Sequence, residues 1–293
     1  MSGMKIGALR KACISALSDG GNDNAQFDAE QLLMKFCGIT RSDMLLFPAL
    51  DVAEEQVGAV LDAVSRRNSG EPLQYILGEW EFYGLPFYVG EGVLIPRQDT
   101  ETIAELALSY AKEHKSADFL AADLCAGSGC IGITLAKLAG VPVKLLELSE
   151  QALEYLRRNI ELNSVQGLCG ALRADVLLQE TAESLLPLDL IVTNPPYLTA
   201  QDMRELQTEV THEPEAALFG GEDGLDYYRR MIPLWGERLK PGGMLAAEIG
   251  MGQENDVMRI FEECGMHAQY KKDLCGVIRV IYGIKNGMKN GGK

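Results

Sequence analysis

The sequence predicts an α/β protein: a Rossmann-like, mostly parallel sheet with an antiparallel C-terminal strand, preceded by a small all-α domain and a β-hairpin. Three observations predict this fold. Apolar runs of strand length alternate with helical patterns after residue 91, as in doubly wound sheets. The first 70 residues carry apolar positions at helical spacing instead. Between these regions, residues 71–90 are rich in aromatic side chains and contain a Gly-Leu-Pro turn.

Residues 1–73 are predicted to form the helical domain, with a role in docking a substrate or partner. Gly38 and Gly70 are the expected helix ends. They follow apolar residues at helical spacing, namely Leu32, Leu33, Phe36, Val57, Val60, Leu61 and Val64. We expect no strand and no reactive cluster in this region. Residues 74–92 are predicted to form the β-hairpin linker.

Residues 93–285 are predicted to form the sheet domain. Each strand-like run leads into a loop and then a helical pattern, and the runs lie at residues 119–124, 143–148, 189–194 and 244–250. An antiparallel pair, at about residues 268–274 and 276–283, is expected to end the domain. Residues 286–293 are expected to form a disordered tail.

Composition and charge narrow the classes of function. The 293 residues include 42 Asp+Glu and 27 Lys+Arg, so the net charge is 27 − 42 = −15, which argues against broad binding to nucleic acid. Seven scattered cysteines form no CxxC pair and only three histidines are present, so no metal site is predicted. No signal peptide or apolar run of membrane-spanning length is evident. We therefore expect a cytoplasmic protein with reduced thiols and no membrane contact, and nothing in the sequence requires more than a monomer.

A glycine-rich turn after the first strand of the sheet domain predicts a ligand site. Asp123 precedes Gly127 and Gly129 where a strand-like run becomes a helix. Glycine lets the backbone approach a ligand, and the helix N-terminus offers free N–H groups. Tight turns need glycine in any case, so this signal is weak alone. Neither GxGxxG nor GK[ST] is present, which disfavours a pyrophosphate cofactor.

Two acids extend this predicted site. Glu147 ends the second strand about 20 residues beyond the glycine turn, where an acid accepts hydrogen bonds from ribose hydroxyls. A solvated acid at a strand end is the alternative. Asp175 follows the third strand, where an adenine edge would lie. Together these residues predict a pocket for a nucleoside with a cationic or zwitterionic tail, and S-adenosylmethionine fits better than NAD.

The tetrapeptide Asn194-Pro195-Pro196-Tyr197 follows the apolar strand 189–193. The prolines end the strand and present carbonyl groups rigidly. Oxygen acceptors on the Asn194 side chain and the Pro195 carbonyl suit a planar –NH₂ group, on which the Tyr197 ring would stack. Acceptors on both protons would direct the nitrogen lone pair toward an electrophilic methyl group. The alternative is a proline-rich turn without chemistry.

These motifs together resemble those of the class I, S-adenosylmethionine-dependent amino methyltransferases. Further segments narrow the resemblance to the protein-(glutamine-N5) methyltransferases of peptide-chain release factors, the HemK/PrmC family, and these are LIPRQDTE (94–101), HEPEAALFGGEDGLDYYR (212–229), LAAEIGMGQ (245–253) and DLCGVIRV (273–280). The resemblance spans nearly the whole chain. It implies methyl transfer to the glutamine of a Gly-Gly-Gln loop, with release factors as protein partners.

The resemblance also assigns residues. It places the cofactor loop on Cys125, Ala126, Gly127, Ser128 and Gly129, the ribose acid on Glu147, and an adenine-side contact at Val176. It places the glutamine-binding tetrapeptide on Asn194 to Tyr197. It puts the segment 94–101 beside the pocket, so Arg97 and Thr100 become candidate ligand contacts.

Two residues depart from the family pattern. Glu147 replaces the usual aspartate, and we expect ribose binding to survive on the longer arm. Cys125 replaces the first glycine of the loop, and a cysteine there predicts that the backbone angle is not left-handed. We expect no reactive role for the Cys125 thiol, since the transfer needs none.

Nearby polar residues have structural interpretations. Asp99, Thr100 and Glu101 are predicted to form an N-cap and first helical turn. His212 is predicted to order a loop rather than act as a base. Two other functions remain open: an N6-adenine methyltransferase acting on DNA or RNA, since the tetrapeptide also suits an adenine amino group, and a non-catalytic adaptor for a translation factor. The absence of a basic groove argues against the first.

Overall fold

The computed structural model describes residues 4–286, and its contacts divide the chain into two units. The helical unit comprises Met1–Glu79 with Gln207–His212, and the sheet unit comprises Trp80–Leu206 with Glu213–Lys293. The helical unit thus extends beyond the expected boundary at residue 73. It also takes in residues 207–212, which lie within the expected sheet domain. Of the predicted tail, the structure describes Asn286, whose side chain donates to the Gly265 carbonyl (3.1 Å), while 287–293 lie outside the described residues.

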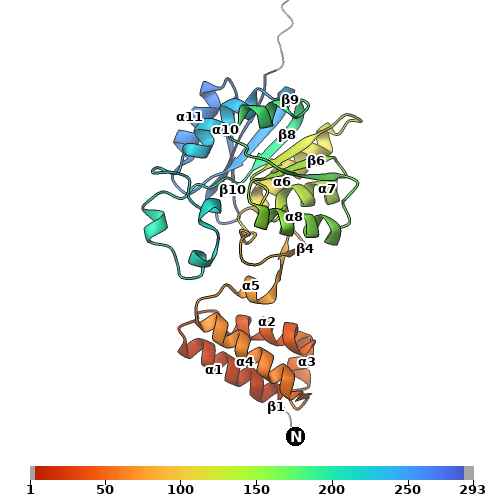
Figure 1. Cartoon of the computed structure of the whole chain (residues 1–293), viewed down its shortest axis with the longest axis vertical. Helices are drawn as coiled ribbons and strands as arrows, with labels where there is room; N and C mark the ends of the chain where they lie inside the picture. The colour runs from red at the N-terminus through yellow and green to blue at the C-terminus, as the bar shows by residue number, and fades with distance from the viewer. Residues whose placement is uncertain (1–3, 287–293) are drawn as a thin grey trace, which may run out of the picture. The chain divides into compact units, whose positions relative to one another are not determined.

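Five helices make up most of the helical unit: α1 (Ile6–Asp19), α2 (Ala25–Cys37), α3 (Arg41–Leu46), α4 (Glu54–Asn68) and α5 (Leu73–Leu77). Figure 1 shows α1, α2 and α4 side by side, and their buried faces include Leu9, Leu32, Leu33 and Val60. The expectation of no strand here is wrong, because β1 (Met4–Lys5) and β2 (Asp51–Val52) pair antiparallel.

Local signals explain the junction between α2 and α3. Gly38 caps α2 in the left-handed conformation, with φ 67°, as its position predicts. Two residues later, Thr40 and Asp43 form a capping box in which each side chain accepts the other's backbone N–H. These contacts satisfy backbone groups that the two helix ends leave free.

The predicted hairpin is present but shorter than the expected linker. Its strands are β3 (Glu79–Phe82) and β4 (Leu85–Tyr88). The turn between them is Tyr83-Gly84, with φ 52° and 75°, rather than Gly-Leu-Pro, so the expected turn is misplaced. The first part of the linker forms α5 instead of a strand, because Pro72 starts a helical turn that Gly78 ends with φ 73°.

The sheet unit contains a seven-stranded sheet in the order β10-β11-β9-β8-β5-β6-β7. Its strands are β5 (Ala121–Leu124), β6 (Val143–Glu147), β7 (Cys169–Arg173), β8 (Leu188–Thr193), β9 (Leu239–Glu248), β10 (His267–Lys272) and β11 (Ile278–Ile284). The strands β9, β8, β5, β6 and β7 pair in parallel, whereas β11 runs antiparallel to both β9 and β10. The predicted sheet with an antiparallel C-terminal strand is confirmed.

Helices cover both faces of this sheet (Figure 1). One buried cluster joins the sheet to α6 (Glu101–His114), α7 (Cys130–Ala139) and α8 (Glu150–Leu162). The opposite cluster joins it to α9 (Gln179–Glu183), α10 (Asp226–Gly236) and α11 (Glu254–Glu263). Short 3₁₀ turns follow β8, at Asp202–Arg204, Val210–His212 and Glu215–Ala217. Within residues 4–286, no helix has the length and apolar character to cross a membrane.

The strand order reverses at β5, and this point positions the site. From β5 the chain adds β6 and β7 on one side and then β8 and β9 on the other. The last residues of β5 and β8, Leu124 and Thr193, are register partners, and the Thr193 hydroxyl donates to the Leu124 carbonyl (2.9 Å). The loops that begin at Cys125 and Asn194 therefore leave the sheet side by side. Ligands of open α/β sheets bind in such a crevice.

Candidate functional site

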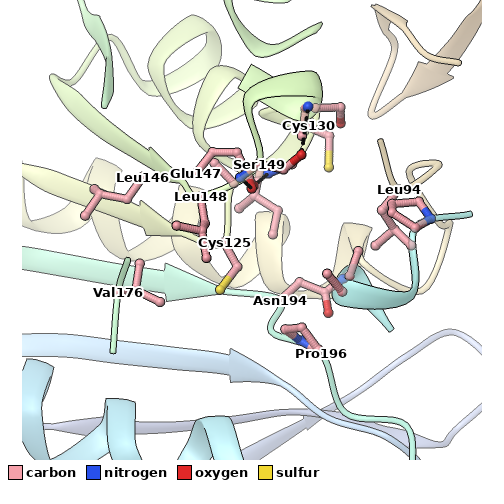
Figure 2. Close-up of a pocket in the computed structure, with 18 of the residues that line it drawn as sticks. Leu94, Cys125, Cys130, Leu146, Glu147, Leu148, Ser149, Val176, Asn194 and Pro196 are labelled. Carbon is pink, nitrogen blue, oxygen red and sulfur yellow. Dashed lines mark hydrogen bonds between the residues drawn. The ribbon is translucent and has the colours of Figure 1, made fainter. Parts of the chain in front are cut away.

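A cavity of about 240 Å³ lies at this crevice, within the sheet unit. It brings together most of the predicted site residues: Arg97, Thr100, Cys125, Ala126, Gly127, Ser128, Glu147, Asp175, Val176, Asn194 and Pro196. Figure 2 shows Val176, Cys125 and Glu147 on one part of the wall and Asn194 and Pro196 on another. Four predicted residues, Asp123, Gly129, Pro195 and Tyr197, do not line it.

The glycine-rich loop is held open by Glu147. One Glu147 carboxylate oxygen accepts the Gly127 N–H (2.8 Å), and the other accepts the Ser149 N–H (2.7 Å). Gly127 and Gly129 have φ 55° and 83°, so both need the freedom of glycine. A Cβ at Gly127 would meet no atom of the chain, whereas one at Gly129 would lie 2.4 Å from Leu156. Gly127 therefore leaves space for a ligand, and Gly129 allows the loop to pack on the core.

The structure corrects the prediction that the backbone at Cys125 is not left-handed. Its φ is 59°, which is the left-handed conformation that the cysteine appeared to exclude. The following residue is fixed to the neighbouring strand, since the Ala126 N–H donates to the Leu146 carbonyl (2.9 Å). Burial raises the pKa of the Cys125 thiol well above its usual range, and the nearby Glu147 and Asp123 carboxylates raise it further. The side chain is thus a neutral thiol, in keeping with the expected lack of a reactive role.

Asp123 lies beneath the loop rather than in the cavity. Its buried carboxylate accepts the Gly132 N–H (2.8 Å) at the start of α7, while its Oδ1 atom has no partner among residues 4–286. Burial raises the pKa of Asp123 to about 7, against the lowering effect of the Gly132 hydrogen bond. Because Asp123 is buried and does not line the cavity, the hydrogen bond to Gly132 is the contact that the structure shows for its carboxyl group among residues 4–286.

Asp175 and Val176 define another part of the wall. An Asp175 carboxylate oxygen accepts the Leu177 N–H (2.8 Å), which shapes the loop after β7. The Val176 carbonyl accepts the Trp235 indole N–H (2.8 Å), which ties this loop to α10. The Val176 side chain is left as an apolar part of the cavity wall.

Asn194 carries an unused acceptor. Its Nδ2 group donates to the Thr100 hydroxyl (3.3 Å), and its buried Oδ1 atom has no partner among the described residues. Thr100 occupies the N-cap position of α6 as predicted, but its side chain caps no backbone N–H of the helix. A buried carbonyl oxygen without a partner is costly in free energy and is a suitable acceptor for a ligand N–H.

The backbone of Pro196 and Tyr197 is held by neighbouring segments of the chain. The Gln253 side chain donates to the Tyr197 carbonyl (3.0 Å) and accepts the Gly250 N–H (2.9 Å). A Cβ at Gly220 would lie 2.7 Å from the Pro196 carbonyl oxygen, and one at Gly224 would lie 2.3 Å from that of Tyr197. These glycines, in the segment 212–229, thus allow close backbone approach. The stacking of Tyr197 on a substrate stays a prediction.

Glu213 is a structural residue that the sequence analysis missed. It is buried, its carboxylate accepts the Ile95 N–H (2.9 Å), and it forms an ion pair with Arg97. Glu213, the neighbour of His212, therefore orders the segment 94–101 beside the cavity. Glu248, the last residue of β9, was also missed, although an acid that ends an apolar strand of this sheet was a visible signal.

Comparison with known proteins finds matching family models and related chains. The PrmC N-terminal domain family matches residues 8–78, and the methyltransferase small domain family matches residues 104–223. The release factor glutamine methyltransferase of Geobacter sulfurreducens is 40% identical over 270 residues, covering 91% of this chain and 92% of that protein. The protein of the same name from Clostridium acetobutylicum is 33% identical over 273 residues, covering 91% and 94%.

A solved structure supports the fold alone. The hMettl16 catalytic domain, solved in complex with the MAT2A 3′UTR hairpin 6, has a TM-score of 0.56 and is 14% identical, covering 82% of this chain and 84% of that one. The sequence relatives are far more similar and extend over nearly all of both chains. The chain belongs to the release factor glutamine methyltransferase family.

Proposed function

We propose that this chain transfers a methyl group from S-adenosylmethionine to the side-chain amide nitrogen of the glutamine in the Gly-Gly-Gln loop of peptide-chain release factors. The observation that carries the proposal is the unpartnered Oδ1 atom of Asn194, a residue that lines the cavity. A glutamine –NH₂ group donates the hydrogen bond that this oxygen lacks. The names of the full-length relatives favour the same acceptor.

An adenine base in DNA or RNA is the less favoured acceptor. It would meet the same Asn194 oxygen, so geometry alone does not separate the two. The net charge of −15 opposes a phosphate backbone, and the full-length relatives carry the release-factor name. All seven cysteines are free thiols, which supports action in a reducing compartment such as the cytosol.

The residues present fit the cofactor. Glu147 offers carboxylate oxygens for ribose hydroxyls, the loop 125–129 leaves open space at Gly127, and Val176 offers an apolar surface. When bound, S-adenosylmethionine supplies an electrophilic methyl group on a sulfonium sulfur. Two cysteines among the described residues line this cavity, Cys125 and Cys130, and burial raises the pKa of both thiols, so neither is held as a thiolate.

Asn194 and the adjoining carbonyl then orient the acceptor. The Asn194 Oδ1 atom accepts one hydrogen of the glutamine amide. The Pro195 carbonyl stays the predicted acceptor of the second hydrogen, although Pro195 does not line the cavity. Held in this way, the nitrogen presents its lone pair toward the methyl group instead of rotating freely. After transfer the nitrogen returns one proton to water, so no side chain is needed as a general base.

The experiment that tests this function is mass spectrometry of the Gly-Gly-Gln peptide after the protein has been incubated with a release factor and labelled S-adenosylmethionine. We expect one added methyl group on the glutamine. The matched control is Asn194→Ala, which should abolish transfer while calorimetry still detects cofactor binding. An unmodified glutamine with the wild-type protein would reject the proposal, and label on RNA or duplex DNA instead would select the alternative.

A further inference from the structure

The inference begins at the ends of β8 and β9, which carry Asn194 and Glu248. Thr193 and Ala247 are register partners in these parallel strands, so the residues that follow them lie at the same level of the sheet. The Glu248 side chain is only 2% exposed. One of its carboxylate oxygens, Oε2, has no partner among residues 4–286. A buried acid therefore lies next to the residue proposed to hold the acceptor amide.

Thr100 connects these two side chains. It is 2% exposed, its hydroxyl accepts the Asn194 Nδ2 group (3.3 Å), and it is close enough to the Glu248 carboxyl group to lower the pKa of that group. A threonine hydroxyl has a single hydrogen to donate. When that hydrogen is donated to an ionised Glu248, the hydroxyl can only accept from Asn194. The Asn194 amide must then turn its nitrogen toward Thr100 and its oxygen away from Thr100.

We propose that Glu248, acting through the Thr100 hydroxyl, is a positioning residue that orients the Asn194 amide for methyl transfer. The proposal rests on the proposed function, because it assumes that the Asn194 oxygen receives the acceptor N–H. We call the path from Glu248 through the Thr100 hydroxyl to Asn194 the relay. The two ends of the Asn194 amide differ little in size, so without the relay the nitrogen end can face the cavity. A donor there would repel the –NH₂ group of glutamine.

The relay also makes transfer depend on pH. Burial raises the pKa of Glu248 to about 7, although the Thr100 hydrogen bond lowers it. The groups that interact with Glu248 come from several elements: Arg97, Asp99 and Thr100 before α6, Cys130 of α7, Tyr197 after β8, Tyr228 of α10 and Arg279 of β11. A protonated Glu248 can itself donate to Thr100, so it no longer dictates the orientation of Asn194. We therefore expect kcat to rise with pH through about 7.

Paired variants separate this role from a general effect on folding. Thr100→Val removes the hydroxyl at nearly constant volume, and Thr100→Ser restores it. We expect Thr100→Val to lower kcat about tenfold, the loss that one misplaced hydrogen bond produces, with the KM for release factor nearly unchanged. Thr100→Ser should recover most of the rate. Melting temperature and the calorimetric Kd for S-adenosylmethionine check that the variants remain folded and bind cofactor.

Glu248→Gln tests the acid. Its amide group, like a protonated carboxyl group, can also donate to Thr100, so we expect the variant to show the low-pH rate of the wild type at every pH, with no rise through pH 7. A readout without catalysis is the NMR signal of the Asn194 side-chain NH₂ group, assigned with Asn194→Ala. That signal should titrate with a midpoint near pH 7 in the wild type and lose this titration in Glu248→Gln.

The outcomes are distinct. An unchanged kcat in folded Thr100→Val, or an Asn194 signal that titrates alike in wild type and Glu248→Gln, would overturn the relay. If the wild type leaves release factor unmodified while the Asn194 signal follows Glu248, the proposed function fails and the relay stands. If the wild type methylates release factor with no pH response of that signal, the function stands and the relay fails.

Discussion

Single residues at the cavity show how strongly the surrounding structure determines a local conformation. Cys125 adopts φ 59° although it has a side chain, since the loop lies between β5 and α7 and its next residue is hydrogen bonded to β6. A left-handed conformation costs a residue with a Cβ atom roughly 1–2 kcal/mol. Tertiary contacts therefore maintain a backbone angle that the residue itself disfavours.

This strain is testable with two substitutions at the same position. Cys125→Ala removes the thiol but keeps a Cβ atom at φ 59°, whereas Cys125→Gly removes both the thiol and the strain. We expect the glycine variant to be more stable than the alanine variant by about 1 kcal/mol, because glycine populates the left-handed region freely. Urea unfolding of the two purified proteins measures the difference, and equal midpoints would show that residue 125 stores no strain.

At the scale of elements, a buried ion pair joins α2 to α4 in the helical unit. Asp28 of α2 is buried and accepts from Arg67 of α4 (2.7 Å), and Arg67, with a side chain 9% exposed, also pairs with Glu209 (2.5 Å). The ion pair with Arg67 links residue 209 to the helical unit, to which its contacts assign it. It explains why a short stretch that is distant in sequence groups with these helices.

The ion pairs of Arg67 with Asp28 and Glu209, here called the Arg67 network, predict that substitution of Arg67 destabilises the protein more than substitution of the neighbouring Arg66. Arg67→Met should destabilise the protein by about 3 kcal/mol, because it leaves the Asp28 carboxylate buried without its cation. The matched control is Arg66→Met, since Arg66 has a side chain 44% exposed and pairs with Glu71 near the surface. We expect that change to cost less than about 1 kcal/mol. Thermal unfolding of both variants gives the comparison, and similar losses would show that the Arg67 network contributes no more than a surface pair.

For the whole molecule, two buried carboxyl groups with raised pKa values contribute to how the stability changes with pH. Burial raises the pKa of both Asp123 and Glu248 to about 7. The folded state therefore retains protons that the unfolded chain releases at lower pH. The stabilisation from these groups is present in full below the unfolded pKa values and is lost as the pH rises through about 7.

Comparison with Glu248→Gln isolates one of these groups. A glutamine does not titrate, so the variant should gain stability relative to the wild type as the pH rises. Between pH 4 and pH 8 we expect the gain to reach about 3 kcal/mol, from a pKa of 4.5 in the unfolded chain and about 7 in the folded protein. Urea unfolding at a series of pH values measures it, and a difference independent of pH would mean that Glu248 titrates normally.

Several features of this protein follow from the sequence by itself. The order of strands and helices in the sheet unit follows from hydrophobic periodicity, which depends on neighbouring residues. The loop at Cys125 to Gly129 and the tetrapeptide at Asn194 to Tyr197 each lie at the end of an apolar run, so their place at one edge of a parallel sheet was predictable. The shorter hairpin and the helix α5 could not be predicted in this way. The residues before Gly78 also suited a strand, but they form a helical turn that Gly78 ends.

Only the tertiary structure placed Thr100, Asn194 and Glu248 close together. These residues are far apart in the chain, and their contact depends on β9 pairing with β8 in a particular register and on where α6 begins. The left-handed angle of Cys125 and the grouping of residues 207–212 with the helical unit have the same origin. Periodicity and motifs report interactions along the chain, whereas strand register, burial and the resulting pKa values arise from groups that folding brings together.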